Sequence, residues 1–401
     1  MKLFKNLSDA VVHCLFEIFL EKRYADKVIE HTLKKNKKWG ARDRRFVAEN
    51  TYEMVRWWRL ICDVSKMREI KSEEDIWKLF GTWCVLNSWE LPEWHSLKSI
   101  NKEQTLASYE KLKRIRKIGE SIPDWLDEMG ANELGKLWDK ELSALNEEAK
   151  VVLRVNTLKT NKKYLFEKLV EQGVESSELP GMENTLVLAQ RRNVFRFPEF
   201  KEGFFEMQDA SSQAVGLFLD VKPGMRVIDA CAGAGGKTLQ LAALMENKGR
   251  IIAMDKEQWK LDELKKRARR AGAGNIETRM IDSAKVIKRM ENSADRLLLD
   301  VPCSGTGVIK RNPDAKWKLS PEFIVKVKAE QQKILSEYSA MLKKDGVMVY
   351  STCSIFPSEN HKQVEKFLSE NSDKFELLKQ ETIFPSQGFD GFYMAAIKKK
   401  V

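Results

Sequence analysis

The sequence is poor in histidine and has no closely spaced pair of cysteines. Its four histidines, His13, His31, His95 and His361, are scattered over 401 residues, which disfavours a histidine-rich metal site. The six cysteines include no C-x-x-C pair, so neither a zinc module nor a disulfide framework is predicted. Widely spaced cysteines are typical of a reducing compartment, and we expect a cytoplasmic protein that binds no metal.

Long hydrophobic runs are also missing. None is long enough to cross a bilayer. In residues 1–22, Asp9, His13 and Glu17 interrupt the apolar stretch and no small-residue cleavage site follows, so we interpret this segment as an amphipathic helix and not as a signal peptide. We find no internal repeat and no low-complexity tract. These absences favour a globular protein that does not bind membranes, and we expect a monomer.

The charge balance is basic. The chain has 70 Lys and Arg against 59 Asp and Glu, a net charge of +11, which suggests an anionic partner such as nucleic acid. A well-solvated basic surface would explain the same balance. The densest basic run in the first half of the chain, residues 111–117 (KLKRIRK), is open to both interpretations.

The first 140 residues have helical patterns, and a change of pattern predicts a boundary near residue 142. One helix face is especially regular, with Val47, Thr51, Met54, Trp58 and Ile61 spaced by three and four residues. We expect these side chains to belong to a core.

Two further parts follow. Residues 143–205 contain a strand (VVLRVNT), a helix (NKKYLFEKLVEQG) and a strand (NTLVLA), which predicts a small α+β subdomain. From residue 206, strands alternate with helices, which predicts a doubly wound, mostly parallel sheet. The expected strands are RVIDA, RIIAMD, IETRMI, RLLLDV and GVMVYST, with helices over 237–245, 257–271, 321–343 and 358–369. The end, residues 388–400, resembles a hairpin that closes the sheet edge.

The loop after the first of these strands, DACAGAGGKT, has two interpretations. Gly236, Lys237 and Thr238 fit the end of a phosphate-binding P-loop, but the leading glycine of that motif is replaced by Cys231. The alternative is a loop for S-adenosylmethionine (SAM), in which glycines let backbone amides approach the ligand. Asp255, at the end of the second strand, would then hold the ribose hydroxyls.

Asp255 alone does not separate SAM from NAD, because dinucleotide folds place an acidic residue at the same point. Asp282 ends the third strand and could hold the adenine side. Asp300 ends the fourth strand. Each aspartate alone could cap a helix, but three at successive strand ends favour a ligand site.

Cys303 and Cys353 follow the fourth and fifth strands, and each is followed by serine. A lone buried cysteine is usually a small hydrophobic residue. Because these strands should be neighbours, we expect both thiols to face one cleft. A SAM site with two thiols suits methylation of cytosine at carbon 5, in which a thiolate first adds to carbon 6. Asp300 would stabilise the adduct near ring nitrogen 3, and Lys237 would lower the pKa of the attacking thiol.

At these residues the sequence resembles the Sun/Nop-type RNA cytosine-5 methyltransferases. The matching stretches are EMQDASSQAVG (206–216), DACAGAGGKT (229–238), AMDKE (253–257), DVPCSGTGVIKRNPDAKW (300–317) and YSTCSIFPSEN (350–360). LRVNTLK (153–159) is similar to the start of the family's RNA-recognition subdomain. RDRRFVAENTYEMVRWW (42–58) more weakly resembles the NusB-like domain of the bacterial 16S rRNA member.

The resemblance implies a Rossmann-like sheet of seven strands, with the last one antiparallel. It assigns the nucleophile to Cys353 and gives Cys303 the role of assisting proton removal or product release. The SAM-binding positions would be Cys231, Ala232, Gly233, Ala234, Gly235, Gly236, Lys237, Asp255, Asp282 and Asp300.

One loop position departs from the family. The family usually has Ala-Pro where this chain has Gly233 and Ala234, so we expect a looser loop. DNA cytosine methyltransferases would instead make Cys303 the nucleophile, but their Gln-Arg-Arg element lies downstream of the SAM site, whereas QRR here lies upstream, at 190–192. The expected substrate is rRNA, specifically 16S rRNA or the small ribosomal subunit. The alternatives are a P-loop NTPase that acts on RNA and a catalytically inactive rRNA-binding or assembly protein.

Overall fold

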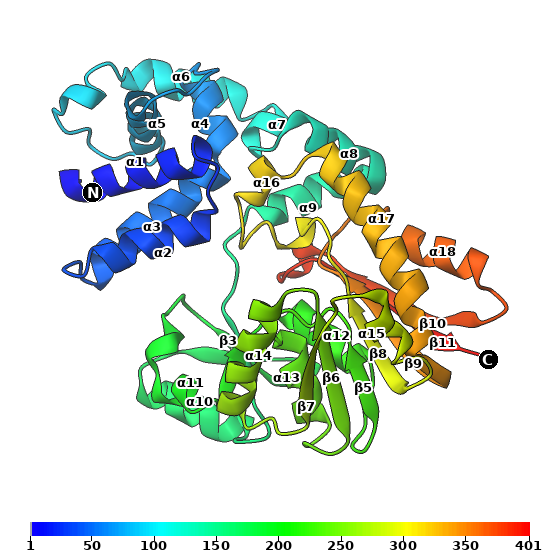
Figure 1. The fold of residues 1–401 in the computed structure, drawn as a ribbon. Helices are drawn as coiled ribbons and strands as arrows, with labels where there is room; N and C mark the ends of the chain where they lie inside the picture. The colour runs from blue at the N-terminus through cyan, green and yellow to red at the C-terminus, as the bar shows by residue number, and fades with distance from the viewer. Residues whose placement is uncertain (1) are drawn as a thin grey trace. The chain divides into compact units, whose positions relative to one another are not determined.

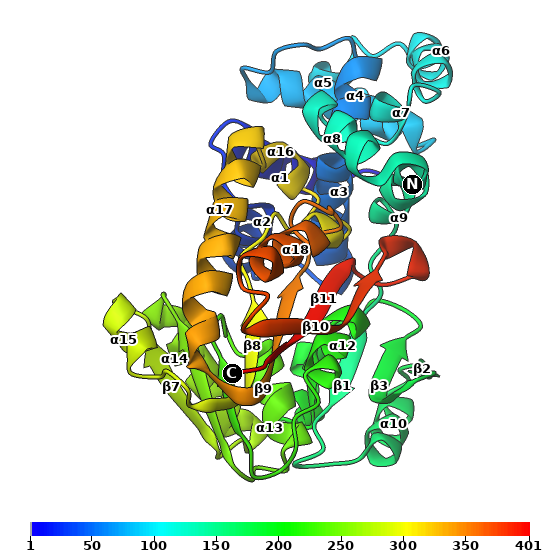
Figure 2. The same cartoon turned by 90° about the vertical axis from the view of Figure 1, so that its right-hand side faces the viewer.

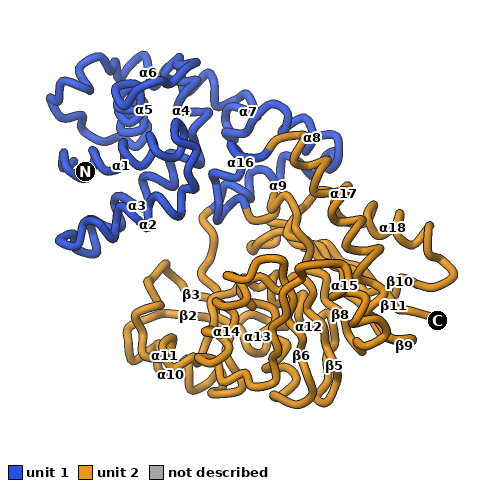
Figure 3. Tube along the Cα trace, in the orientation of Figure 1, with its two compact units in different colours: residues 1–147, 309–319 blue, residues 148–308, 320–401 orange. Residues whose placement is uncertain are grey.

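The computed structural model describes residues 2–401 and has two compact units (Figure 3). One unit contains the chain up to residue 147 together with residues 309–319. The other contains residues 148–308 and 320–401. The polypeptide therefore passes between the units three times. Among the helices of the described chain, none has the length and hydrophobicity that crossing a membrane requires.

The first unit is all-helical, as predicted. Its predicted core face is confirmed, since Val47, Thr51, Met54, Trp58 and Ile61 are all buried, although the helix is broken at Trp57. The helices are α1 (Lys5–Phe19), α2 (Ala25–Lys35), α3 (Ala41–Arg56), α4 (Trp58–Val64), α5 (Glu73–Leu86), α6 (Lys102–Leu112), α7 (Arg116–Gly119), α8 (Asp124–Leu134), α9 (Trp138–Leu145) and α16 (Ala315–Lys318). Short 3₁₀ turns lie at His95–Leu97 and Gly135–Leu137.

Helix α16 belongs to the inserted segment 309–319, which the helical unit holds through a buried lysine. The Lys316 ammonium donates hydrogen bonds to the carbonyl oxygens of Arg56 (3.2 Å) and Ser121 (3.0 Å) and to Asn146 Oδ1 (2.6 Å). Burial lowers the pKa of Lys316 to about 7. The next residue, Trp317, donates from Nε1 to the Val55 carbonyl at 2.7 Å. The segment is thus fixed by backbone carbonyls of α3 and of the turn at Ser121 and by the side chain of Asn146.

We expect Lys316→Met to lower the free energy of unfolding of the helical unit by about 1–3 kcal/mol, because buried acceptors lose their donor. Trp259 apart, every tryptophan of the chain lies in this unit, so denaturation followed by tryptophan fluorescence reports its unfolding. Lys111→Met, at an exposed lysine of the same unit, is the matched control. Equal midpoints for the two variants would contradict the prediction.

The second unit begins with a small antiparallel sheet of order β2-β3-β1-β4. Its strands are β1 (Val152–Val155), β2 (Ser176–Leu179), β3 (Met182–Leu188) and β4 (Phe205–Met207), with helices α10 (Lys162–Glu171) and α11 (Pro198–Lys201) and a 3₁₀ turn at Val194–Arg196. The predicted strand–helix–strand pattern is confirmed. Strands β2 and β4 were not predicted, because β2 is mostly polar and β4 has only three residues.

The large sheet has seven strands in the order β10-β11-β9-β8-β5-β6-β7, and β11 is antiparallel to both neighbours. The strands are β5 (Arg226–Asp229), β6 (Arg250–Asp255), β7 (Ile276–Met280), β8 (Ala294–Asp300), β9 (Leu342–Thr352), β10 (Phe375–Ile383) and β11 (Phe392–Lys399). This confirms the predicted Rossmann-like methyltransferase fold. A hairpin does close this sheet edge, but residues 388–400 supply only its second strand, β11, and the mostly exposed β10 is its first strand and the edge.

Helices cover both faces of this sheet (Figures 1 and 2). Apolar residues of α12 and α13 pack on one face with Val227, Ile251 and Leu298, and α14 adds to that layer. Residues of α15, α17 and α18 pack on the other face with Ile228 and Leu297. The helices are α12 (Ala210–Phe218), α13 (Gly236–Leu244), α14 (Gln258–Ala271), α15 (Ala284–Lys288), α17 (Pro321–Tyr338) and α18 (His361–Glu370), with 3₁₀ turns at Thr306–Val308, Ser339–Met341 and Pro385–Gln387.

Candidate active site

The predicted site residues follow the carboxyl ends of five parallel strands. These strands stand in the order β9-β8-β5-β6-β7, so the loops after them open on the same edge of the sheet. Asp300 at the end of β8 pairs in register with Ser351 of β9. Asp255 ends β6, and Asp282 follows β7. The fold therefore brings residues as far apart in the chain as Cys231 and Cys353 to one edge of the sheet.

The glycine-rich loop after β5 is shaped by two left-handed residues. Gly233 has φ +53° and Gly235 has φ +89°. A Cβ atom on Gly235 would lie 2.5 Å from Leu264 Cγ, so only glycine fits there. The Gly233 amide donates to Asp255 Oδ2 at 2.9 Å, and the Glu257 amide donates to Oδ1 at 2.9 Å. The loop and the acidic residue of the next strand thus fix one another.

Two groups at the base of this loop are shielded from solvent, since Asp229 is buried and Cys231 is partly buried. Burial raises the pKa of Asp229 to about 7, and Thr238 Oγ1 donates to its Oδ2 at 2.7 Å. Burial also raises the pKa of the Cys231 thiol, which packs against the core between the sheet and helices α15, α17 and α18. A thiol that keeps its proton is a poor nucleophile, because the thiolate is the reactive form. Cys231 therefore has a structural role in the loop and is no candidate nucleophile.

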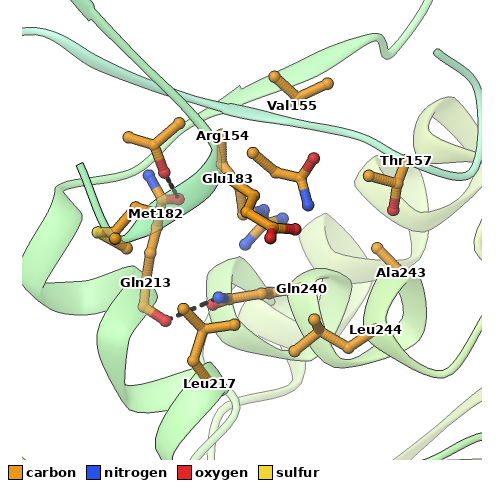
Figure 4. Close-up of a pocket in the computed structure, with 13 residues that line it drawn as sticks. Arg154, Val155, Thr157, Met182, Glu183, Gln213, Leu217, Gln240, Ala243 and Leu244 are labelled. Atoms are coloured by element: carbon orange, nitrogen blue, oxygen red, sulfur yellow. Dashed lines mark hydrogen bonds between the residues drawn. The ribbon is translucent and has the colours of Figure 1, made fainter. Parts of the chain in front are cut away.

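A cavity of about 350 Å³ lies next to the ends of β6 and β7. Its lining includes the charged side chains of Lys256 and Asp282 and the largely apolar side chains of Ile281 and Tyr338. A second cavity, of about 270 Å³, lies among β1, β3, α12 and α13 (Figure 4). Among the residues that the structure describes, none of the predicted site residues lines this second cavity. The first cavity is the one that continues the predicted site.

The two predicted catalytic cysteines lie side by side. Cys303 Sγ and Cys353 Sγ are 3.3 Å apart, and both thiols are free. The hydrogen bond to Cys353 and burial raise the pKa of Cys303 well above its ordinary value. Cys303 therefore keeps its proton at neutral pH and can donate it in a hydrogen bond to the sulfur of Cys353.

A buried carboxylate holds both cysteine loops. Glu359 is fully buried and accepts the Ser304 amide on Oε2 at 2.8 Å and the Ser354 hydroxyl on Oε1 at 2.6 Å. The Ser304 hydroxyl donates to the same Oε1, and Gln331 Nε2 donates to Oε2 at 3.1 Å. Ser304 and Ser354 each follow one of the two cysteines, so a single carboxylate connects the residues next to both thiols.

Asp300 stands next to this pair and is held from two sides. Lys237 Nζ lies 2.6 Å from its Oδ2, and Ser351 Oγ donates to Oδ1 at 2.9 Å. The Lys237 ammonium also lies 5.0 Å from the centre of the Phe392 ring. The structure thus directs the Lys237 charge to the Asp300 carboxylate, whereas the sequence had suggested the attacking thiol as its target.

Sequence reasoning missed Glu359 and Gln331. Glu359 lies in the SIFPSEN stretch, and its signal was a lone acidic residue among apolar and hydroxyl neighbours. Gln331 gave no signal in the sequence, because a glutamine in an amphipathic helix is ordinary.

The basic run 111–117 is partly paired within the helical unit. Arg116 pairs with Asp127 and Asp139, and Lys117 pairs with Asp124. Part of that run is therefore neutralised within its own unit.

We expect Glu359→Gln to reduce the rate of methyl transfer at saturating substrates by about 10- to 100-fold. The amide places an N–H group against donors that the carboxylate now accepts, so the loops of Cys303 and Cys353 lose their common anchor. Single-turnover transfer from labelled SAM to RNA measures the effect. Glu365→Gln, at an exposed glutamate of α18, is the control, and equal rates in both variants would refute the role.

Comparison with known proteins decides the family. A probable ribosomal RNA small subunit methyltransferase B of Synechocystis is 31% identical over 94% of this chain and 95% of its own length. The family model described as 16S rRNA methyltransferase RsmB/F matches residues 216–398. This chain belongs to the RsmB/F family. It is therefore an RNA methyltransferase, which confirms the predicted resemblance and decides against the P-loop and inactive alternatives.

Other comparisons agree with the membership in the RsmB/F family. The model for the family's ferredoxin-like domain matches residues 122–195. A methyltransferase homologue from Pyrococcus horikoshii is 26% identical, with a TM-score of 0.63 over 71% of this chain and 98% of its own. The crystal structure of PH0851 has the same fold over the whole of both chains, with a TM-score of 0.83 at 24% identity.

The methyl donor of this RsmB/F chain is SAM. The residues present fit it, since the amides of the glycine-rich loop start helix α13, and backbone N–H groups at a helix start suit an anionic group such as the SAM carboxylate. The carboxylates at the ends of β6 and β7 suit hydroxyl and amino groups of a nucleoside, and the neighbouring cavity has apolar walls for a ring.

Proposed function

We propose that the protein forms 5-methylcytosine in 16S rRNA through a covalent cysteine–cytosine adduct. The observation that carries the proposal is the pair of free thiols 3.3 Å apart at the ends of neighbouring strands β8 and β9. Two thiols and a carboxylate suit a ring that must be activated by addition before it can accept a methyl group. The Synechocystis relative, named for the small-subunit ribosomal RNA, supports the choice of 16S rRNA.

SAM, when bound, supplies an electrophilic methyl group. Residues 231–237 would hold its amino-acid end against the loop amides. Asp255 would accept hydrogen bonds from the ribose hydroxyls, because each of its oxygens keeps a lone pair besides the one used by Gly233 or Glu257. Asp282, at the rim of the cavity, would receive the adenine amino group.

Cys353 is the proposed nucleophile and adds to carbon 6 of cytosine. The 3.3 Å between the two sulfurs supports this pairing, because the Cys303 thiol can donate a hydrogen bond to the Cys353 sulfur. After methylation, solvent water takes the carbon-5 proton, and the electron pair of that C–H bond restores the double bond between carbons 5 and 6 as the carbon–sulfur bond breaks. The same hydrogen bond from Cys303 stabilises the departing thiolate, so Cys303 assists release.

Asp300 is proposed to bind the target ring near nitrogen 3. It is about one quarter exposed, so it can meet a base from the cleft while Lys237 and Ser351 hold its other side. A proton shared between the Asp300 carboxyl group and ring nitrogen 3 would stabilise the electron-rich ring of the adduct, and the Lys237 ammonium would stabilise the carboxylate that remains when the proton moves to nitrogen 3. The target cytosine must be single-stranded or flipped to reach this position.

The rest of the molecule suits RNA. We propose that a NusB-like helical part (1–142) binds RNA or a partner, that residues 143–205 recognise RNA, and that residues 206–401 catalyse transfer. The net charge of +11 supports salt-dependent binding to the phosphate backbone. The six free cysteines support a reducing, cytoplasmic setting for a monomeric enzyme.

Substitution of each catalytic cysteine should give a different product. We expect Cys353→Ala to abolish methyl transfer and adduct formation, because no thiolate reaches carbon 6. Cys303→Ala should accumulate a covalent protein–RNA complex, because release of the sulfur slows. Denaturing gel electrophoresis with labelled RNA measures both, and Cys62→Ala, at a cysteine of the helical unit, is the control. Clean turnover by Cys303→Ala would reverse the assignment.

The product and target base can be tested directly. The purified protein, labelled SAM and either naked 16S rRNA or small subunits should give label in 5-methylcytosine after nucleoside digestion. Bisulfite mapping of rRNA from cells with and without the gene should then show one cytosine that loses protection in the deletion. Transfer to another position of the base, or to no RNA, would overturn the proposal.

A further inference from the structure

Two arginines donate hydrogen bonds to carbonyl oxygens of the glycine-rich loop. Arg267 Nη1, from α14, donates to the Ala234 carbonyl at 2.8 Å. Arg154 Nη1, from β1, donates to the Gly236 carbonyl at 2.7 Å. The two acceptors lie two residues apart on either side of Gly235. The loop is thus held by hydrogen bonds from Arg267 and Arg154 to its carbonyl groups, in addition to the hydrogen bond from its Gly233 amide to Asp255.

Both guanidinium groups also donate hydrogen bonds to side chains of strand β4 or of the residue that follows it. Arg267 Nη2 donates to Glu206 Oε2 at 2.9 Å, and Glu206, in β4, is 4% exposed and also accepts from Arg270. Arg154 donates to Gln208, directly after β4. Each arginine therefore bridges the segment 206–208 to a loop carbonyl.

Arg154 is unsuited to contact RNA phosphates because it is buried. It is 5% exposed and lies at the wall of the cavity that it shares with Gln213 and Gln240 (Figure 4). Burial lowers the pKa of Arg154 to about 10, so the group stays charged at neutral pH. Its charge is directed to internal acceptors, where charge-assisted hydrogen bonds are strongest.

The loop needs such support because it contains three glycines, Gly233, Gly235 and Gly236. Glycine increases the conformational freedom that binding must remove. We propose that Arg267 and Arg154 are positioning residues that keep the SAM loop in its binding conformation. The inference rests on the proposed assignment of residues 231–237 to SAM.

SAM affinity tests the role of Arg267. The full-length protein is titrated with SAM by calorimetry, and we expect Arg267→Met to raise the dissociation constant by about tenfold or more, with partial recovery in Arg267→Lys. Lysine can donate to the Ala234 carbonyl but cannot bridge it to Glu206 in the same planar geometry. Arg269→Met, at an exposed arginine of the same helix, should bind SAM like the unmodified protein.

Kinetics and hydrogen exchange separate this role from a general loss of fold. Arg267→Met should raise the KM for SAM while the KM for RNA stays unchanged, and the amides of residues 232–236 should exchange faster. Unchanged SAM affinity and loop exchange would overturn the inference. If Arg267→Met does not fold, the same measurements on Arg267→Lys decide. No SAM binding by the unmodified protein would instead overturn the proposed cofactor site.

Discussion

The arrangement of Cys303 and Cys353 depends on one buried carboxylate, that of Glu359. Both of its oxygens accept hydrogen bonds, and the donors belong to Ser304, Ser354 and Gln331. An uncompensated carboxylate in an interior is very costly, so these donors must stay in place for the fold to be stable. Because Ser304 and Ser354 follow Cys303 and Cys353, the hydrogen bonds that stabilise Glu359 also hold the two sulfurs 3.3 Å apart.

The same principle recurs along the sheet edge. A short loop after one strand is fixed by a polar group from the next strand, as Asp255 fixes the Gly233 amide and Ser351 fixes Asp300. Parallel strands make this possible, because their carboxyl ends meet at one edge. The site is therefore built from pairs of loops, and each loop is ordered by a residue whose own strand is rigid.

The sequence predicted most regular elements of the catalytic part because their apolar and polar residues follow strand and helix periods. It also predicted which strand ends carry Asp255, Asp282, Asp300, Cys303 and Cys353. It failed at β10, whose side chains are mostly exposed and polar, and at β11, whose interior place depends on pairing with β9. Strand order is set by contacts between distant segments, which local periodicity does not record.

The assignment of residues 309–319 shows the same limit. The stretch from Asp300 to Trp317 is continuous in sequence, but its last part belongs to the helical unit through Lys316 and Trp317. Nothing in the spacing of these residues indicates that a lysine will be buried among carbonyl groups, because its acceptors come from Arg56, Ser121 and Asn146. Such contacts become visible only once the helices are packed.

The sequence by itself determined the chemical groups, namely two thiols, a glycine-rich loop and three strand-end aspartates, since residue types are fixed before folding. Tertiary structure decided how these groups act. It placed the two sulfurs in contact, paired the Lys237 ammonium with Asp300, packed Cys231 against the core and joined the loop carbonyls to Arg154 and Arg267 through hydrogen bonds. These outcomes depend on distance and desolvation, which arise only when segments far apart in the chain are packed together.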